Sequence, residues 1–270
     1  MKRLILLLFL IIIIADFSYS QRRRSTRWKQ TRYEIVYHAG ATNFLGELGG
    51  ADQIGTNYLR DFEIAMSRPA LGVGLRYKIL KTLSVKGGLY YGIIRGDDKT
   101  TDEPARKNRN LHFRSPIIEF SPHIEWHFVS EREGHRYNLR KVRGLFGYAI
   151  SMYVYTGFSV LYFNPKAKYQ GKWRALQPLG TEGQGLIPTR KKYSRVTMAI
   201  PLGFGIKYKL DRNWYIGIEY NMNKTFSDYM DDVSTSYYDN DLLRAERGDM
   251  AADLADQALG TEGYPSQYQA

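Results

Sequence analysis

Polar and apolar side chains alternate between residues 117 and 129. From 118 to 128 the even positions hold Ile, Phe, Pro, Ile, Trp and Phe. The odd positions hold Glu119, Ser121, His123, Glu125 and His127. Ser, His and a carboxylate are the components of a nucleophilic site, and two histidines with a carboxylate can bind a metal. A strand would place His123 and His127 roughly 13 Å apart, which argues against a shared metal ion, and a hydrogen-bonded interior network is the simpler interpretation.

This alternation predicts an extended strand with one apolar face and one polar face. The same pattern recurs in six further segments, at residues 33–42, 71–79, 83–93, 146–162, 198–208 and 214–222. The seven segments are about 9 to 17 residues long, and a tilted strand needs roughly 9–11 residues to cross a membrane. An apolar outside and a polar inside are typical of a transmembrane β-barrel. We therefore expect an all-β fold, an antiparallel outer-membrane barrel of about eight strands.

The polar faces of these segments carry charges of both signs. The predicted network in the barrel lumen consists of Glu34, Arg76, Lys86, Glu119, Glu125, Lys207 and Glu219. Buried charges are tolerated when they are paired. Many of the other inward residues are small, which fits the narrow interior of a barrel of about eight strands. The sequence thus favours a packed polar core over an open pore.

The chain divides into four regions. Residues 1–20 resemble a cleaved signal peptide, with a basic start, a short apolar run and small residues at its end. Residues 21–31 form a basic periplasmic tail, residues 32–226 the barrel, and residues 227–270 an acidic, partly helical loop or tail. The protein has no Cys, which excludes a lipid-modified N-terminus and disulfides.

The connections between strands alternate in length. Turns at 80–81 and 211–213 are short, whereas the connections at 44–68, 95–114, 166–192 and from 227 onward are long. Bacterial barrels keep short turns in the periplasm and long loops outside. The polar link 130–142 is long for a periplasmic turn and is a candidate contact surface. Seven strands are an odd number, so we expect a last strand to be missing from this chain.

The formal net charge is +12, but an exported protein rarely meets nucleic acid, and none is expected as a partner. The basic cluster between Arg22 and Arg32 is either a solvated tail or is attracted to anionic lipid or an acidic partner. The basic loop 106–109, with Arg114 nearby, either neutralises lipopolysaccharide phosphates or is an ordinary solvated loop. The Gly-rich segments 46–50 and 180–185 lack the Lys-Ser/Thr pair of a phosphate loop. No catalytic residue, cofactor or metal is expected.

Several phrases in the chain, taken in order, are similar to a known family. They lie at residues 43–50, 109–115, 117–121, 163–167, 176–185, 200–205 and 225–234. Their most distinctive residues are Asn43, Gly46, Gly49, Gly50, Arg109, Asn110, Arg114, Asn164, Pro165, Gly180, Thr181, Glu182, Gly183, Asp228, Asp231 and Asp232. From about residue 33 to 237 the chain resembles the PorG-type outer-membrane barrels of the Bacteroidetes type IX secretion system.

The resemblance implies a non-enzymatic component of that protein secretion machinery. Its implied partners are outer-membrane lipid and the subunits of a periplasmic ring, a PorK/PorN-like lipoprotein and its soluble partner. The tail 21–31 and the link 130–142 are the elements expected to meet that ring. Two alternatives remain: a general envelope-stability or adhesion barrel with long surface loops, and a barrel hydrolase or acyltransferase acting on lipids. The last would need Ser121 or Ser151 near a lumen histidine toward the outer rim.

Overall fold

A computed structural model of the chain describes residues 31–46, 48, 66–100, 103–131, 149–211 and 213–260. The predicted signal peptide and nearly all of the basic tail lie outside the described residues. Most of the link 130–142, residues 49–50 of the first family-like phrase, and the end of the chain from 261 also lie outside them.

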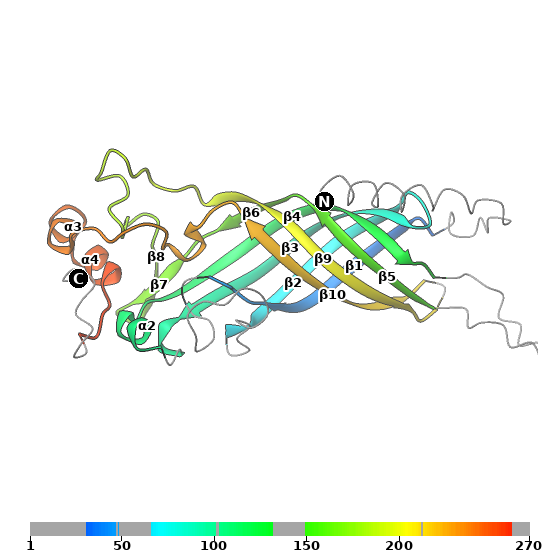
Figure 1. Cartoon of the computed structure of the whole chain (residues 1–270), viewed down its shortest axis with the longest axis horizontal. Coiled ribbons are helices and arrows are strands. Elements are labelled where there is room, and N and C mark those ends of the chain that lie inside the picture. The colour runs from blue at the N-terminus through cyan, green and yellow to red at the C-terminus, as the bar shows by residue number, and fades with distance from the viewer. Residues whose placement is uncertain are drawn as a thin grey trace, which may run out of the picture.

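The described chain is mostly one antiparallel sheet (Figure 1). Its main path has the order β1-β2-β3-β4-β5-β9-β10, and β6, β7 and β8 lie beside it. The strands are β1 (Tyr33–Thr42), β2 (Arg68–Lys78), β3 (Leu83–Asp97), β4 (His112–Val129), β5 (Ile150–Gly157), β6 (Ser159–Phe163), β7 (Lys166–Tyr169), β8 (Lys172–Ala175), β9 (Val196–Lys209) and β10 (Tyr215–Thr225). An all-β architecture is therefore confirmed.

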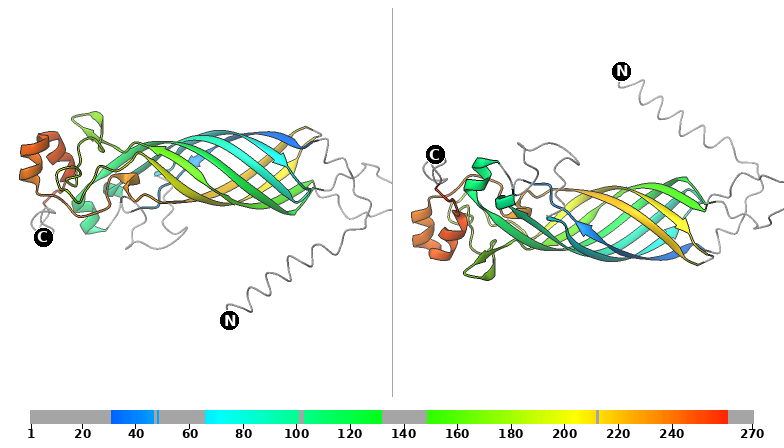
Figure 2. Two further views of the ribbon diagram at one scale, coloured as in Figure 1. Left: turned by 90° about the horizontal axis from the view of Figure 1, so that it is seen from above. Right: turned by 90° about the horizontal axis from the view of Figure 1, so that it is seen from below.

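The two ends of the sheet differ. At one end, here called the tight-turn end, Leu80 N donates to Leu83 O (2.9 Å) and Leu210 N donates to Trp214 O (3.0 Å), which closes the short β2–β3 and β9–β10 connections. The opposite end, the loop end, carries the short helices α2 (Pro104–Arg109), α3 (Asn240–Arg247) and α4 (Asp249–Ala255). Figure 2 shows the long strands winding side by side between these ends.

The sheet is curled. This follows from contacts between side chains of its first strands and side chains of its last strands. Arg76 on β2 reaches Glu219 on β10, and Lys207 on β9 reaches Glu34 on β1. All of these contacts lie on one face, the concave face. Within the described residues β1 pairs with β2 alone and β10 with β9 alone.

The convex face is apolar and exposed, as the alternation predicts. Ile218 is 80% exposed and Tyr37 is 78% exposed. The even residues of β4 are exposed from Ile118 to Phe128, whereas its odd residues from Glu119 to His127 are buried. The sheet therefore buries its polar face, which reverses the usual arrangement of a water-soluble sheet.

Two sequence predictions need correction. The segment 146–162 is not one strand: β5 begins at Ile150, and the chain breaks at Phe158 before β6, although β5 and β6 both pair with β4 and β9. The sequence analysis assigns no strand to the long connection 166–192, whereas the structure has the hairpin β7–β8 within it. Residues 146–148 lie outside the described residues.

The long connections pack together at the loop end. One apolar core joins side chains from six parts of the chain, namely Leu48, Ile94, Leu111, Phe113, Phe163, Tyr193 and Met230. Two smaller cores hold α3 and α4 against the hairpin β7–β8 and the residues that follow it. Within the described residues, no helix has the length and apolarity needed to span a membrane.

Candidate functional site

Arg76 is the centre of a charged network on the concave face. Its guanidinium donates to Glu34 (2.9 Å), to Glu125 (3.0 Å) and to Glu219 (3.1 Å), which come from β1, β4 and β10. A planar guanidinium with five N–H donors suits such a branched arrangement. One cation therefore links three carboxylates that are far apart in the sequence.

Three lysines complete this concave network. Lys86 Nζ lies 2.7 Å from Glu219 Oε2, and Lys207 Nζ lies 3.0 Å from Glu34. Lys78, which the sequence analysis did not include, contacts both Glu34 (2.6 Å) and Glu131 (3.1 Å). The formal charges cancel, because the four cations Arg76, Lys78, Lys86 and Lys207 meet the four carboxylates Glu34, Glu125, Glu131 and Glu219.

The centre of the network is fully buried. The side chains of Lys86 and Glu125 have no solvent exposure. Tyr153 donates its hydroxyl to Glu219 and accepts from Arg76 (2.9 Å). Removing a single partner from such a network leaves an uncompensated buried charge.

Glu119 is placed differently from the other predicted network residues. It accepts hydrogen bonds from Ser159 Oγ (2.7 Å) and Asn223 Nδ2 (2.9 Å). Among the described residues no cation lies within ion-pair distance of it. Glu119 therefore lies on the same face as the network but is held by neutral donors.

The histidines of β4 do not form a nucleophilic site at the outer rim. His127 lies between Ser84 (3.0 Å from Nε2) and Ser151 (2.9 Å from Nδ1), and all three side chains are buried near the tight-turn end. His123 stacks on the ring of Tyr155, with centroids 4.5 Å apart. His123 and His127 are both buried, each 3% exposed, and fill the interior behind the concave face.

The family-like phrases come together at the loop end. In the turn 180–185, Gly180 and Gly183 have φ values of +65° and +75°, which only glycine adopts readily. This turn buries Glu182, whose carboxylate accepts from Ser234 N and Thr235 N (both 3.0 Å) and from the Thr235 hydroxyl (2.7 Å). One carboxylate therefore fastens the phrase 176–185 to the end of the phrase 225–234.

Asp232 provides a second buried junction. Its carboxylate accepts from Thr181 Oγ1 (2.6 Å) and from the hydroxyl of Tyr193. Burial raises the pKa of Asp232 to about 7; the two hydroxyl donors act against this rise, and the neighbouring Glu182 adds to it. Burial beside Asp232 also raises the pKa of Tyr193. Thr181, Glu182, Tyr193 and Asp232 are called the loop-end cluster below.

The remaining family-like residues are also structural at this end. Arg109 binds the fully buried Asp98 through two nitrogens (2.8 and 3.0 Å). Asn110 ends α2 in the left-handed region, at φ 57°. The other described family-like residues make local contacts or are buried there: Asn43 with Ser67, Gly46 against Phe44, Arg114 over Trp173, Asn164 with Ser115, Pro165 in the core, Asp228 with Ser234, and Asp231 with Val233. Gly49 and Gly50 lie outside the described residues.

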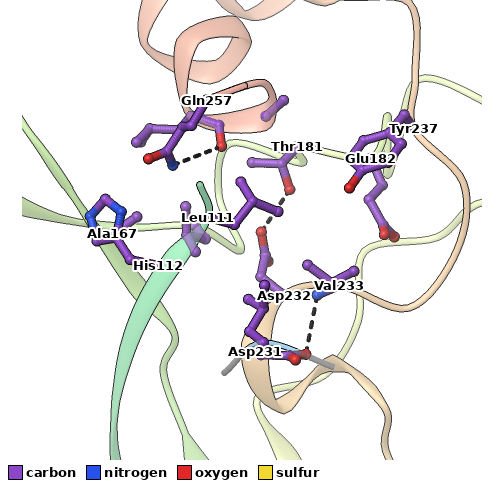
Figure 3. A pocket seen from close by; sticks show the side chains of 14 residues that line it. Leu111, His112, Ala167, Thr181, Glu182, Asp231, Asp232, Val233, Tyr237 and Gln257 are labelled. Carbon is purple, nitrogen blue, oxygen red and sulfur yellow. Dashed lines mark hydrogen bonds between the residues drawn. The ribbon is translucent and has the colours of Figure 1, made fainter. Parts of the chain in front are cut away.

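A small cavity of about 30 Å³ lies beside the loop-end cluster (Figure 3). Its lining includes Leu111, Thr181 and Asp232. Ligand pockets have volumes of roughly 300–1,000 Å³, so this cavity has room for little more than water. Among the described residues no group of three or more His, Cys, Asp or Glu side chains has the geometry of a metal site.

Sequence reasoning missed three groups that matter here: Lys78, Asp98 and Tyr193. Lys78 continues the alternation of β2 on the same face as Arg76, so its inward position was available from the pattern. Asp98 and Tyr193 lie in segments without periodicity, and their roles depend on contacts with Arg109 and Asp232. No sequence signal identified those contacts.

Comparison with known proteins gives one family. The model described as "Domain of unknown function (DUF6089)" matches residues 8–253. This match covers most of the chain, which therefore belongs to that family. No curated protein and no solved structure matches the chain.

Proposed function

We propose that this member of the DUF6089 family crosses the outer membrane of a Gram-negative bacterium as a small antiparallel β-barrel. In this proposal a signal peptide exports it, and it serves as a non-enzymatic component of the type IX secretion machinery. The observation that carries the membrane assignment is the reversed sheet: apolar side chains cover its convex face, and paired charges fill its concave face.

The exposed apolar surface supports a lipid environment. On β10, Ile216, Ile218 and Met222 all face outward and are exposed. Contiguous apolar surface of this extent is rare on soluble monomers, and each large side chain moved out of water contributes roughly 1.5–3 kcal/mol. Aromatic side chains also line both edges of the apolar band, as in interfacial girdles. They are Tyr33, Trp126 and Trp214 toward the tight turns, and Tyr91 and Tyr162 toward the loops.

The strand directions bear on closure of the barrel. β1 and β10 both run from the tight-turn end to the loop end, because each pairs antiparallel with a strand, β2 or β9, that ends at a tight turn. An antiparallel barrel needs edge strands of opposite direction. One further strand, running from the loop end toward the tight turns, would pair with both and give an even number.

The role in secretion rests on the resemblance to PorG-type barrels. A concave face filled by the charge network is a poor conduit for protein, and it is compatible with a membrane anchor. We propose that the tail 21–31 and the link 130–142 dock a PorK/PorN-like lipoprotein and its partner at the periplasmic side, where tight turns lie in bacterial barrels.

The membrane assignment is tested by cell fractionation and by gel mobility. The native protein should sediment with outer membranes and migrate faster in an unheated SDS gel than after boiling. Phe120→Arg, on the exposed face of β4, should lower the folded fraction, because a cation near the bilayer midplane costs roughly 2–4 kcal/mol. Lys191→Glu, a charge change in an exposed loop, is the control. A protein that is soluble and folded without detergent would refute the assignment.

The secretion role is tested by site-specific cross-linking in cells. A photoreactive residue placed at Ser130, the first residue of the link, should capture the ring lipoprotein or its partner, whereas one at Gly171, in the β7–β8 turn, should not. Deletion of the gene should abolish export of secreted substrates. Normal export in the deletion strain would contradict this role even if the barrel is confirmed.

A second candidate is an envelope-stability or adhesion barrel. It is favoured by the packed loop end, where Leu48, Tyr193 and Met230 from separate connections share one core. Such a preformed surface suits recognition outside the cell. Intact export together with lost surface binding, or with detergent sensitivity, in the deletion strain would support this alternative.

A further inference from the structure

Three cations lie side by side on the convex face at the loop end. In the pairing registers, Arg95 on β3 faces Arg114 on β4, and Arg114 faces Lys166 on β7. All three point away from the core, because their neighbours Ile94, Phe113 and Ala167 are buried. Like charges placed directly opposite each other on neighbouring strands destabilise a sheet, so this row calls for a counter-charge.

The described part of the protein supplies little of that counter-charge. Asp97 pairs with Arg95 at 2.9 Å. No carboxylate within the described residues lies at ion-pair distance from Arg114 or Lys166. The Arg114 guanidinium instead lies over the ring of Trp173, 5.7 Å from its centroid, and exposed Lys168 pairs with Trp173 across the β7–β8 hairpin.

The row lies directly beyond the apolar band. One register level of that band is formed by Tyr91, Ile118 and Tyr162, all exposed and paired across β3, β4 and β6. Arg95 lies four residues after Tyr91 on β3, and Arg114 lies four residues before Ile118 on the antiparallel β4. Both cations are therefore roughly 13 Å closer to the loop end along their strands. If the apolar band marks the hydrocarbon core, the cations stand at the height of the lipid headgroups.

From this arrangement we infer that Arg95, Arg114 and Lys166, flanked by Lys168 and Trp173, bind the phosphate groups of an anionic outer-leaflet lipid. Arginine forms bidentate bonds with phosphate oxygens, and lysine supplies a point charge. The indole of Trp173 holds the Arg114 guanidinium in place and suits the interfacial position. This inference rests on the proposed outer-membrane location, and it names a lipid partner and the residues that recognise it.

The test compares lipid binding by three folded proteins purified in mild detergent. They are the native chain, the double variant Arg114→Gln/Lys166→Gln, and the control Lys172→Gln/Lys191→Gln. The control removes the same charge from two exposed positions, the first residue of β8 and the connection between β8 and β9. Binding of bisphosphorylated lipid A is measured by native mass spectrometry, alongside lipid A without phosphates and inorganic phosphate. The heat-dependent gel shift verifies that each protein is folded.

We expect the native chain and the control to bind bisphosphorylated lipid A alike. Each cation near a membrane surface contributes a factor of about five, so the double variant should bind about 30-fold more weakly. Equal binding by the double variant, equal binding of phosphate-free lipid A, or binding of inorganic phosphate alone would overturn the inference. Any of these results with a normal gel shift would leave the membrane assignment intact, whereas the absence of a gel shift in the native chain would count against that assignment itself.

Discussion

The concave network and the loop-end cluster are both buried and polar, yet they compensate their carboxylates in opposite ways. In the network, Glu34, Glu125 and Glu219 face arginine and lysine. In the cluster, Glu182 and Asp232 face hydroxyl and backbone N–H donors, and no ion pair to either lies within the described residues. A nearby opposite charge favours the ionised form of a buried carboxylate, whereas burial without such a charge raises its pKa, as it does for Asp232. We therefore expect the two regions to respond differently to mutation and to pH.

The largest effect is expected for Arg76→Met. This change leaves Glu34, Glu125 and Glu219 with one cation fewer in a buried interior, and removing one partner of a buried pair costs about 3–5 kcal/mol. The folded fraction, read from the heat-dependent gel shift across a urea series, should fall steeply. Arg76→Lys keeps the charge and should restore part of the loss. Unchanged urea resistance in Arg76→Met would show that the network does not hold the sheet together.

The next effect is the pH response of the loop-end cluster. The pKa of Asp232 is about 7, above its ordinary value of 3.8, so the folded protein holds this proton more tightly than the unfolded chain. Stability of the loop end should therefore fall as pH rises from about 4 to about 7 and stay level above that, by up to about 4 kcal/mol. Hydrogen exchange of residues 229–235 measures this change.

The variant Asp232→Asn shows whether the pH response of the loop end comes from Asp232 or from another ionisable group. The amide is neutral at all pH values and keeps an oxygen that accepts from Thr181 or Tyr193, so its protection should be nearly constant from pH 4 to 7. Asp239→Asn, at the exposed start of α3, should follow the native curve. A native curve that matches that of Asp232→Asn would mean that Asp232 is ionised throughout.

A smaller effect is expected for Glu182→Ala. The change leaves the N–H groups of Ser234 and Thr235 without their acceptor. Both bonds are only partly buried, so water can replace part of them, and we expect a total cost of about 1–3 kcal/mol. Limited proteolysis should cut the chain between residues 225 and 260 faster, while the gel shift of the sheet stays normal. Loss of the gel shift would contradict the separation of the two regions.

The smallest effect is expected for Gly183→Ala. Its φ of +75° disfavours a side chain, and a Cβ there would lie 2.7 Å from the ring of Tyr238. A strained position of this kind costs about 1–3 kcal/mol. We expect a modest increase in the rate of proteolysis between residues 225 and 260. Gly171→Ala is the matched comparison, because its φ is also positive but open space surrounds it, so it should cost less.

Much of the sheet was predictable from the chain alone. Alternation in 117–129 assigned Glu125 and His127 to the buried face and Trp126 to the exposed face, as the structure has them. The hairpin β7–β8 was not predictable, because Lys166–Tyr169 and Lys172–Ala175 are only four residues long and each carries two basic residues. The break at Phe158 was also missed, because the apolar alternation continues through it.

The sequence by itself determined which face of each strand is apolar, since side chains of a strand alternate whatever the strand pairs with. It also indicated that charges of both signs would meet inside. Only the tertiary structure decided which charges meet: Arg76 contacts Glu219 although 143 positions separate them. The same holds for the loop end, where Tyr193 and Asp232 are 39 positions apart. Periodicity is a local property of the sequence, whereas a buried contact depends on where distant segments pack. The common role of two family-like phrases is visible only in the folded structure, where Thr181 donates a hydrogen bond to Asp232.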